Sequence, residues 1–395
     1  MTDLTPHTAE QKQMHKKAAE TVQEHAETLL ALSHKLSQNP EIGLKETQSS
    51  RWVYEIAAEV PGARAEYGVG GMETAFVVEA GSGELTITIC AEYDALPEVG
   101  HACGHNVIAA AGVGAFCALA PLAKELGATV RLIGTPAEEN ACGKETLLQA
   151  GVFDGTHAAI MIHPGPIDEV MMNPYAAKNI SVRFIGREAH ASLSPHHGVN
   201  ALDALTVTLT AIGLARQQLE PGQQIHGSIT ERGGAANVIP GSAAATWIVR
   251  ATTMESLDRV ADVLTRCARA GALATGCEIE INDSAHPAYA NMEADNELNE
   301  LYHRNATALG RDPQPVNGFG GSTDMGNVSH RFPSIHPMIG FGDSTLSLHT
   351  PKFASLAASP VGDKAALDGA TLLAQTAIDA ATTPQIRQRL LAAEK

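Results

Sequence analysis

Apolar strands alternate with helices in two parts of this chain, and that alternation restricts the fold more than any other feature of the sequence. In the first part, strands are expected at 74–79, 85–91, 129–134 and 157–162, with helices at 107–126 and 144–150. The pattern resumes near residue 290 with a helix at 296–309 and a strand at 337–342. Strands that alternate with helices are typical of an α/β fold, so we expect a mostly parallel sheet.

Helical spacing of apolar residues marks both ends of the chain. The first ~60 residues contain a helix that stops at Asn39-Pro40, followed by a second helix at 46–58. Near the C-terminus we expect a helix that ends at about Ala381 with Asp363 as its N-cap, and a last short helix from Pro384. The Gly-Ser-Gly sequence at 81–83 predicts a turn between the strands at 74–79 and 85–91.

The middle of the chain has a different order of strands and helices. Its expected elements are strand 179–185, helix 200–219, strands 224–231 and 242–251, helix 254–274 and strand 278–283. The order β-α-β-β-α-β is that of a ferredoxin-like unit. We therefore expect one α/β domain, residues 1–175 plus 288–395, that is interrupted by an inserted α+β domain at 176–287.

Charge and composition argue against several classes of protein. The 27 Lys and Arg against 44 Asp and Glu give a formal net charge of −17, and we see no basic run, so nucleic acid is not an expected partner. We see no apolar stretch that approaches ~18 uninterrupted residues, so no membrane-spanning helix is expected. The N-terminus is polar and the six Cys form no CxxC pair, so we expect reduced thiols in a cytoplasmic protein.

Short polar clusters follow the apolar strands. AEYDALP (91–97), TPAEEN (135–140) and HPGP (163–166) each stand just past the carboxyl end of a strand, and SLHTP (347–351) lies a few residues beyond PMIGFG. Open α/β sheets build their functional sites at this edge. The sequence therefore predicts a site at the carboxyl ends of the strands.

These clusters and the neighbouring GHACGHN (100–106) carry side chains that can bind metal. GHACGHN offers His101, Cys103 and His105 just before a helix, although taken alone it reads equally well as a buried structural Cys with surface His. The adjacent Glu138 and Glu139 point in different directions on a turn, so one can bind metal while the other acts as a general base. The five ligand candidates are Cys103, His105, Glu139, His163 and His349. These ligands suit zinc or a neighbouring transition metal and offer too few oxygens for calcium.

Taken in order, the motifs resemble those of the M20 family of metallopeptidases and amidohydrolases, in the branch with the HACGH signature. That branch includes aminoacylase-like, auxin-conjugate, hippurate and p-aminobenzoyl-glutamate hydrolases. The matching stretches, from about 91 to 351, are AEYDALP, GHACGHN, GTPAEEN, HPG, GREAHAS, NVIPG, GFGGSTDMGNVS and LHTP. GGSTDMGNVSH (320–330) leans toward the dipeptidase-like and aminobenzoyl-glutamate-like members.

The resemblance implies roles for individual residues. The five ligand candidates would hold two divalent metal ions, zinc by default, with manganese, cobalt and nickel as alternatives. Glu138 would be the general base, Asp94 would orient a ligand, and His190 would reach an active site, often that of a partner subunit. The candidate substrate contacts are Asn237, Arg250, Gly321 and Ser322, with Arg250 as a candidate for a substrate carboxylate.

The same resemblance implies a reaction and an assembly. The reaction is hydrolysis of an amide bond in a small N-acyl amino acid or dipeptide-like substrate by metal-activated water. The assembly is a homodimer formed through the inserted domain. Two other readings stay open: a thiol hydrolase with Cys103 as nucleophile and His105 as base, and a non-catalytic protein that kept the metal-binding fold.

Three positions depart from the family pattern or add nothing to it. Glu92 stands where many relatives carry His, which leaves its role open. Asn106 stands where many members of the branch carry Asp. His101 matches the signature without being an expected ligand.

Overall fold

The structure is a computed structural model that describes residues 6–283, 286–316 and 320–393. Contacts divide the chain into two units. The first unit is formed by the described residues of Met1–Asn173, Met292–Gly318 and Asp324–Lys395, and the inserted unit by those of Pro174–Asn291 and Phe319–Thr323. The junctions lie a few residues from those expected at 175/176 and 287/288, and the described residues 320–323 also belong to the inserted unit. Gly318 and Phe319, the first residues of GFGGSTDMGNVS, lie outside the described residues.

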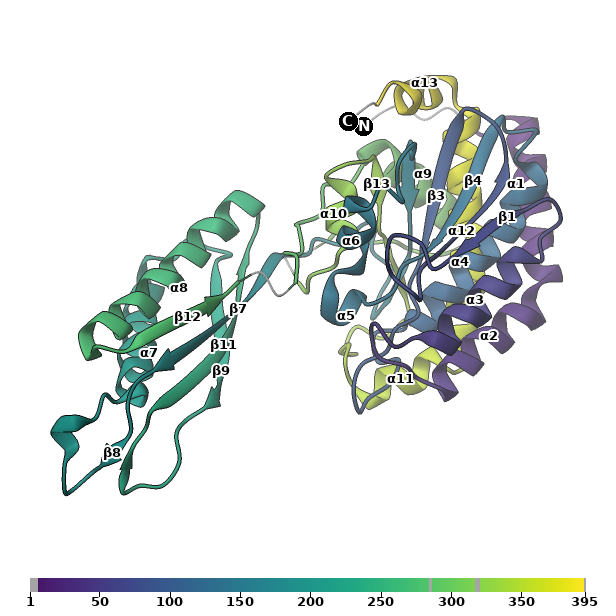
Figure 1. The fold of residues 1–395 in the computed structure, drawn as a ribbon. Coiled ribbons are helices and arrows are strands. Elements are labelled where there is room, and N and C mark those ends of the chain that lie inside the picture. The colour runs from purple at the N-terminus through teal and green to yellow at the C-terminus, as the bar shows by residue number, and fades with distance from the viewer. Residues whose placement is uncertain (1–5, 284–285, 317–319, 394–395) are drawn as a thin grey trace. The chain divides into compact units, whose positions relative to one another are not determined.

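A six-stranded sheet forms the centre of the first unit, with the order β1-β2-β4-β3-β5-β13 (Figure 1). Its strands are β1 (Arg64–Tyr67), β2 (Phe76–Gly81), β3 (Leu85–Ala91), β4 (Ala128–Gly134), β5 (Ala158–Ile160) and β13 (Ser334–Ile335). The pairs β4–β3, β3–β5 and β5–β13 are parallel, whereas β1–β2 and β2–β4 are antiparallel. The expected α/β fold with a mostly parallel sheet is therefore confirmed.

The chain does not form a hairpin at the Gly-Ser-Gly turn, because β4 lies between β2 and β3. The segment that joins them crosses the start of β4. A Cβ atom on Gly83 would lie 2.0 Å from the carbonyl carbon of Gly127, so only glycine fits at this crossing. The Gly-Ser-Gly sequence therefore correctly predicts where the chain turns. It does not predict that β2 and β3 are separated by β4.

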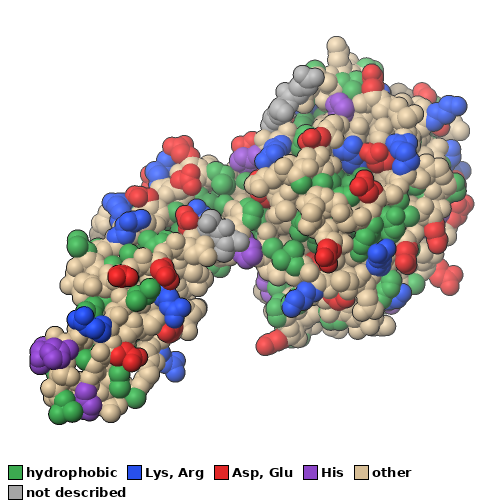
Figure 2. Space-filling view, in the orientation of Figure 1, with side chains coloured by type: hydrophobic (Ala, Val, Ile, Leu, Met, Phe, Trp, Pro, Cys, Tyr) green, Lys and Arg blue, Asp and Glu red, His purple; other side chains and the backbone are tan. Residues whose placement is uncertain are grey.

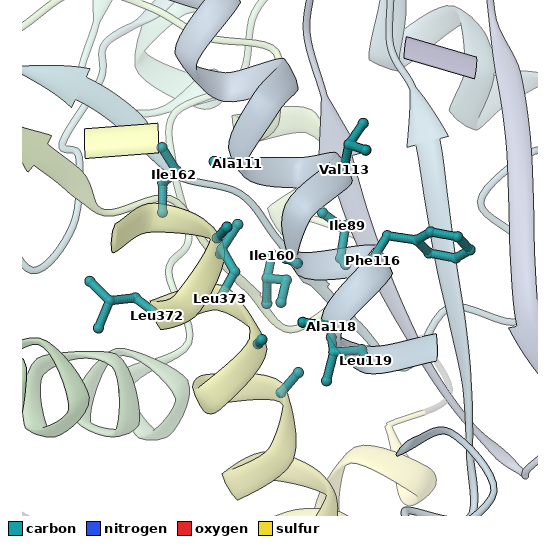
Figure 3. Close-up of a cluster of buried hydrophobic side chains, with 14 of the residues drawn as sticks. Ile89, Ala111, Val113, Phe116, Ala118, Leu119, Ile160, Ile162, Leu372 and Leu373 are labelled. Atoms are coloured by element: carbon teal, nitrogen blue, oxygen red, sulfur yellow. The ribbon is translucent and has the colours of Figure 1, made fainter. Parts of the chain in front are cut away.

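Helices cover both faces of the sheet. They are α1 (Ala9–Glu24), α2 (Ala26–Gln38), α3 (Thr47–Ala58), α4 (His105–Leu119), α5 (Glu138–Ala141), α6 (Gly143–Gln149), α9 (Asn296–Ala308), α10 (Met325–Ser329), α11 (Pro351–Ala357), α12 (Pro360–Thr382) and α13 (Pro384–Ala392). Alternate side chains of a strand point to opposite faces. Ile89 of β3 therefore packs with α4 and α12 (Figure 3), and the next residue, Cys90, packs with Leu147 of α6 and Val328 of α10.

Helix α4 is buried along its whole length, since all fifteen of its residues are buried. The segment His105–Leu122 is long and apolar enough to cross a membrane by length and composition, so the expectation that no such stretch exists is wrong. Because 89% of that segment is buried inside the protein, it is typical of the core helix of a folded domain. Helices α2 and α12 pack against it and supply this cover.

Helix α12 begins three residues before the expected N-cap. Ser359 is the N-cap, and its hydroxyl accepts a hydrogen bond from the amide of Val361, with Pro360 at the first helical position. Asp363 therefore lies in the first turn, where its carboxylate contacts Nε2 of His34 at 2.6 Å. The following helix, α13, starts at Pro384 as expected.

The inserted unit has a four-stranded antiparallel sheet with the order β12-β7-β11-β9, and two helices pack on it. Its elements in chain order are β7 (Ala176–Ile185), β8 (Ala189–His190), α7 (Ala201–Ala215), β9 (Gln224–Glu231), β10 (Val238–Ile239), β11 (Ser242–Ala251), α8 (Met254–Thr275) and β12 (Glu278–Asn282). Leaving aside the short β8 and β10, the order is β-α-β-β-α-β. Figure 2 shows acidic and basic side chains interspersed on the face in view.

Candidate metal centre

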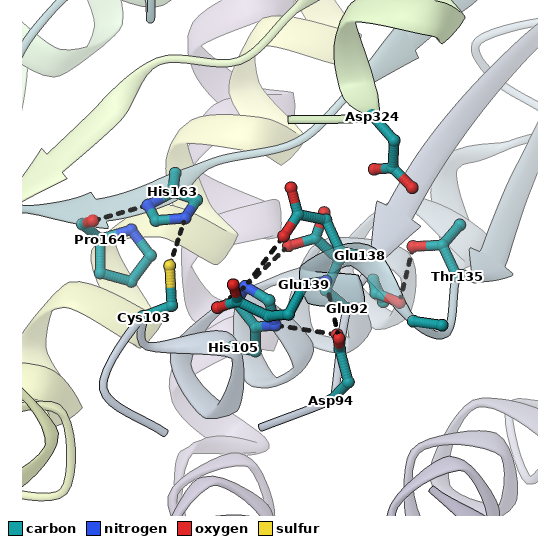
Figure 4. A network of polar contacts seen from close by, with 12 residues as sticks. Glu92, Asp94, Cys103, His105, Thr135, Glu138, Glu139, His163, Pro164 and Asp324 are labelled. Atoms are coloured by element: carbon teal, nitrogen blue, oxygen red, sulfur yellow. Dashed lines mark hydrogen bonds and ion pairs between the residues drawn. The ribbon is translucent and has the colours of Figure 1, made fainter. Parts of the chain in front are cut away.

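The polar clusters of the first unit converge at the carboxyl edge of its sheet (Figure 4). Strand β3 ends at Ala91 and is followed by Glu92 and Asp94, while β4 leads to α5, whose first residue is Glu138. Helix α4 begins with His105. The short strand β6 (His163–Gly165), which pairs with β14 (Met338–Gly340), supplies a further imidazole. Four segments that are separate in the sequence therefore deliver side chains to one place.

Cys103, His105 and His163 each offer one ligand atom within 4.8 Å of the others. Nδ1 of His163 lies 2.7 Å from the carbonyl oxygen of Pro164, and its Nε2 lies 3.4 Å from Sγ of Cys103. Nδ1 of His105 lies 3.0 Å from Oδ1 of Asp94, which fixes the ring and leaves Nε2 toward the site. Asp94 thus lies behind the ring of His105, and such carboxylate partners are usual behind metal-binding imidazoles.

Cys103 also belongs to a second group of three with Glu139 and His349. Nε2 of His349 lies 3.7 Å from Oε1 of Glu139. The backbone of His349 has a φ of 61°, and its amide donates to the carbonyl of Ala102 at 2.9 Å, which ties the His349 loop to the residue before Cys103. The side chain of His349 is 53% exposed, so the centre is open to solvent on this side. All five expected ligands therefore lie together.

Several buried polar atoms at this centre have no hydrogen-bond partner. In the part of the chain that the structure describes, Nε2 of His105 and Oε1 of Glu139 are inaccessible to solvent and make no hydrogen bond. Buried polar atoms are nearly always paired, so unpaired ones require an explanation. A metal ion would satisfy both, and a thiolate, imidazoles and a carboxylate form a donor set that suits a transition metal. The residues present therefore fit a metal ion.

Glu138 is buried at the start of α5, beside the ligands. Burial raises the pKa of its carboxyl group well above the usual value, and Glu92, Glu139 and Asp324 raise it further. A carboxyl group placed beside the ligands can accept a proton from a water molecule and return it, which is what a general base does. The residue before it, Ala137, has a left-handed backbone with φ 61° and ψ 38°.

A buried lysine explains Glu92, whose role the sequence left open. Nζ of Lys144 forms ion pairs with Glu92 and with Oδ1 of Asp324, the latter at 2.6 Å, and all three side chains are almost completely buried. Burial alone would lower the pKa of Lys144, but Asp324 and Glu92 hold it well above its usual value. Oε2 of Glu92 in turn lies 3.3 Å from Nε2 of His105. Glu92 therefore bridges the buried cation and a ligand.

Sequence reasoning missed Lys144, Asp324 and His336. Lys144 lies in the mixed polar and apolar sequence GKETLLQ, which does not mark it as buried, and Asp324 lies within GGSTDMGNVSH, where no role was assigned to it. His336 follows β13 directly, is buried, and its ring centroid lies 5.5 Å from that of His163. Burial lowers the pKa of His336 well below its usual value, and His163 adds to this. The rule of polar residues after strands would have found it, had the two-residue strand β13 been recognised.

In the inserted unit the structure places the remaining candidates in two groups. His190 and Asn237 are neighbours, because β8 pairs with β10 and the amide of Ala191 donates to the carbonyl of Asn237 at 2.9 Å. Nη1 of Arg250 donates to Oγ of Ser322 at 2.5 Å. Gly321 adjoins Ser322 in the same group, and its carbonyl accepts from the amide of Tyr175.

These two groups lie toward opposite ends of the inserted sheet. Arg250 pairs with Ala177 at the start of β7, whereas Ser242 pairs with Ile185 at its end, shortly before His190. Arg250 lies eight residue steps after Ser242 along β11, or roughly 26 Å at the usual rise. Within one inserted unit, a small molecule at Arg250 therefore does not reach His190.

The sequence matches the family described as Peptidase family M20/M25/M40 over residues 88–377. The chain belongs to this family. It is 35% identical over 400 residues to the Xaa-Arg dipeptidase of Mus musculus, covering 97% of this chain and 92% of the mouse protein. It is 33% identical over 392 residues to the Xaa-Arg dipeptidase of Homo sapiens, covering 94% of this chain and 89% of the human protein. A p-aminobenzoyl-glutamate hydrolase chain from Escherichia coli K12 is 32% identical over 274 residues, covering 63% of this chain and 56% of that protein.

Solved structures share the fold. A dinuclear metal binding peptidase of the M20 family from Bacillus subtilis superposes with a TM-score of 0.68 at 22% identity, covering 90% of this chain and 98% of that one. The resemblance inferred from the motifs is thereby confirmed. As a member of this family, the chain is a metal-dependent hydrolase that acts on amide C–N bonds of small substrates.

The burial of Cys103 argues against a thiol hydrolase. Cys103 is buried, and burial followed by the charge of Glu139 raises the pKa of its thiol well above the usual value. A thiol that keeps its proton is a poor nucleophile. Its place among imidazole and carboxylate ligands instead suits metal binding, which requires the thiolate that a cation stabilises.

Proposed function

We propose that this chain is a dipeptidase with two divalent metal ions, and that dipeptides with a C-terminal arginine are the first substrates to examine. The observation that carries the proposal is the sharing of one sulfur: Sγ of Cys103 belongs both to the group with His105 and His163 and to the group with Glu139 and His349. Together these two groups contain all five residues that would hold two metal ions. The 35% identity to a Xaa-Arg dipeptidase over nearly the whole chain supports the substrate class.

The residues of the first unit have separate tasks in this reaction. When bound, the metal ions supply Lewis acidity, which polarises the amide carbonyl and lowers the pKa of water. Glu138 takes a proton from the attacking water and returns it to the leaving amine, in keeping with its raised pKa. Asp94 holds the ring of His105 so that Nε2 faces the centre.

The inserted unit would contribute substrate contacts. The guanidinium of Arg250, held by Ser322, is a cation for the carboxylate of the substrate. His190 and Asn237 would donate to the oxyanion and to the substrate amide. Because His190 lies at the far end of β7 from Arg250, one substrate cannot contact both residues of one protomer. We therefore propose a homodimer through the inserted unit, in which His190 of the partner subunit completes each site.

Zinc is the proposed metal because sulfur and nitrogen donors predominate, and manganese, cobalt or nickel can occupy the same ligands. The decisive experiment combines metal analysis of the purified protein with an assay of Xaa-Arg dipeptides, N-acyl amino acids and p-aminobenzoyl-glutamate. We expect two metal ions per chain, faster cleavage of the dipeptides, loss of activity with a chelator and recovery on adding metal. Chelator-resistant cleavage, or absence of cleavage by the metal-loaded protein, would overturn the proposal.

A further inference from the structure

A segment that precedes α3 holds the loop that carries Glu138 and Glu139. Glu46 is completely buried, and its Oε1 accepts a hydrogen bond from the amide of Ala137 at 2.8 Å. Three residues earlier in the chain, the carbonyl of Gly43 accepts from the side-chain amide of Asn140 at 3.3 Å. These two contacts bracket the two glutamates on both sides.

The contact at Ala137 stabilises an unfavourable backbone conformation. Ala137 has a φ of 61° and a ψ of 38°, which is the left-handed region. A residue with a Cβ atom enters that region at a cost, and it stays there only when its surroundings hold it. The next residue is Glu138, so the direction of its side chain depends on this one backbone conformation.

The second carboxylate oxygen of Glu46 reaches the other acidic loop of the centre. Oε2 accepts from the hydroxyl of Thr74 at 3.2 Å, and the carbonyl of Thr74 accepts from the hydroxyl of Tyr93 at 2.5 Å. Tyr93 stands between Glu92 and Asp94. One buried carboxylate therefore connects the loop after β3 with the loop after β4.

The fit between the two segments is close. A Cβ atom on Gly43 would lie 2.2 Å from Oδ1 of Asn140 and 2.9 Å from Cα of Ala137, so the backbone of the segment touches the loop directly. This leaves little room for the loop to shift while Glu46 stays in place.

We propose that Glu46 is a positioning residue for the hydrolysis, which holds Ala137 in its left-handed conformation and thereby aims Glu138 and Glu139 at the metal centre. The role of Glu46 rests on the proposed function, but the coupling between Glu46 and Ala137 does not. If the coupling exists, replacing Ala137 by glycine, which adopts the left-handed region without penalty, should compensate for the loss of the Glu46 carboxylate.

The experiment compares Glu46→Ala, Ala137→Gly and the double variant by steady-state kinetics, metal content and denaturant unfolding of the metal-free protein. Glu46→Gln is the conservative variant, since its amide oxygen can still accept from Ala137. Glu41→Ala is the matched control: Glu41 lies in the same segment and accepts hydrogen bonds from the amides of Gln48 and Ser49 at the start of α3. In the described structure it makes no hydrogen bond to loop 135–143.

We expect Glu46→Ala to lower kcat by about 100-fold, as a displaced catalytic group does, with KM changed less than about threefold. Ala137→Gly alone should stay near wild type, and in the Glu46→Ala background it should recover about tenfold of the lost kcat. Glu46→Gln and Glu41→Ala should keep kcat. Failure of Ala137→Gly to recover activity, or an equal effect of Glu46→Ala and Glu41→Ala on kcat, would overturn the positioning role.

The unfolding measurements separate this inference from the proposed function. If the metal-loaded wild type cleaves none of the substrates, the proposed function fails. The coupling can then still be read from the free energies of unfolding, where Glu46→Ala should destabilise the wild-type background more than the Ala137→Gly background. Equal destabilisation in both backgrounds would exclude the coupling.

Discussion

The ammonium group of Lys144 lies 2.6 Å from the carboxylate of Asp324, a residue 180 positions further along the chain, and neither side chain is exposed to solvent. The backbone amide of Lys144 also donates to the second oxygen of Asp324 at 2.9 Å. Asp324, Glu92 and Glu138 each place an oxygen within 4.8 Å of the others. Three buried carboxyl groups at such distances repel one another, and Lys144 is the cation that stabilises them.

Lys144→Met should destabilise the protein by about 3–5 kcal/mol, because removing one partner of a buried ion pair leaves uncompensated charge. The measurement is denaturant unfolding of the metal-free protein. Combining Lys144→Met with Asp324→Asn should recover part of the loss. Lys364→Met is the control, since Lys364 is 69% exposed in its pair with Asp368 and should change stability by less than about 1 kcal/mol. A similarly small effect of Lys144→Met on stability would show that Lys144 does not stabilise the buried carboxyl groups.

Glu138→Gln and Glu139→Gln should have different consequences although the residues are adjacent. Glu138→Gln should retain the metal and lose at least about 100-fold in kcat, the lower end of a general-base contribution. Glu139→Gln should weaken metal binding, because Oε1 of Glu139 faces His105 and His349. Metal titration together with kinetics distinguishes the two. Near-normal turnover of Glu138→Gln would show that Glu138 is not the general base.

Mixed dimers test whether His190 acts on the neighbouring protomer. His190→Ala and Glu138→Gln should each be inactive as homodimers. In a heterodimer, the His190→Ala chain keeps Glu138 and receives His190 of the partner subunit, so one site per heterodimer is intact. Random mixing in equal amounts should restore about a quarter of wild-type activity, as expected for exchange in a two-fold dimer. If mixing restores nothing, His190 does not act across the dimer.

A polar cluster that anchors α1 to α12 should make the protein sensitive to acid. Asp379 accepts from Nε2 of His15 at 2.9 Å and from Arg304 at 2.9 Å, and His7 lies 3.0 Å from it. Burial would raise the pKa of Asp379, but the contacts, led by His15, hold it below the usual 3.8. Burial lowers the pKa of His7 below 6.5, although Asp379 opposes this shift.

Both shifts have the same sign in their effect on stability. For each group the unfolded chain binds the proton more readily than the folded chain, so stability is lost as the pH falls. The contribution of His7 should decline below about pH 6.5 and that of Asp379 below its usual 3.8. We expect Tm of wild type to exceed that of Asp379→Asn at pH 7 and the difference to shrink in acid. A difference that is independent of pH would contradict this assignment.

Most of the longer strands could be predicted from sequence because their signals are local, whereas β1 and the two-residue β13 were not predicted. The strand expected at 242–251 corresponds to β11, which occupies Ser242–Ala251 and in which buried and partly buried side chains alternate. The ligand candidates were recognised from polar clusters that follow apolar strands, together with the neighbouring GHACGHN and the later SLHTP. The neighbours of β2 and β3 could not be predicted in this way, because β4, which separates them, is made about forty residues later.

The residues that support the ligands were missed because their roles depend on contacts that are remote in sequence. Glu46 meets Ala137 across 91 positions, and nothing in the sequence around Glu46 distinguishes it from a surface carboxylate. Lys144 similarly looks like an ordinary helix residue until Glu92 and Asp324 are placed beside it. The partners of a buried charged residue are known only once the chain is folded. A ligand motif, in contrast, can be recognised in the amino-acid sequence.

The complete burial of α4 has a consequence for how this protein is made. The helix that covers much of α4, α12, starts about 240 residues after α4 ends. At about 5–20 residues per second, the ribosome needs roughly ten to fifty seconds to synthesise that stretch. During this time an apolar segment with the length and hydropathy of a membrane span lacks its final partner. Full burial of α4 therefore has to wait until α12 has been synthesised.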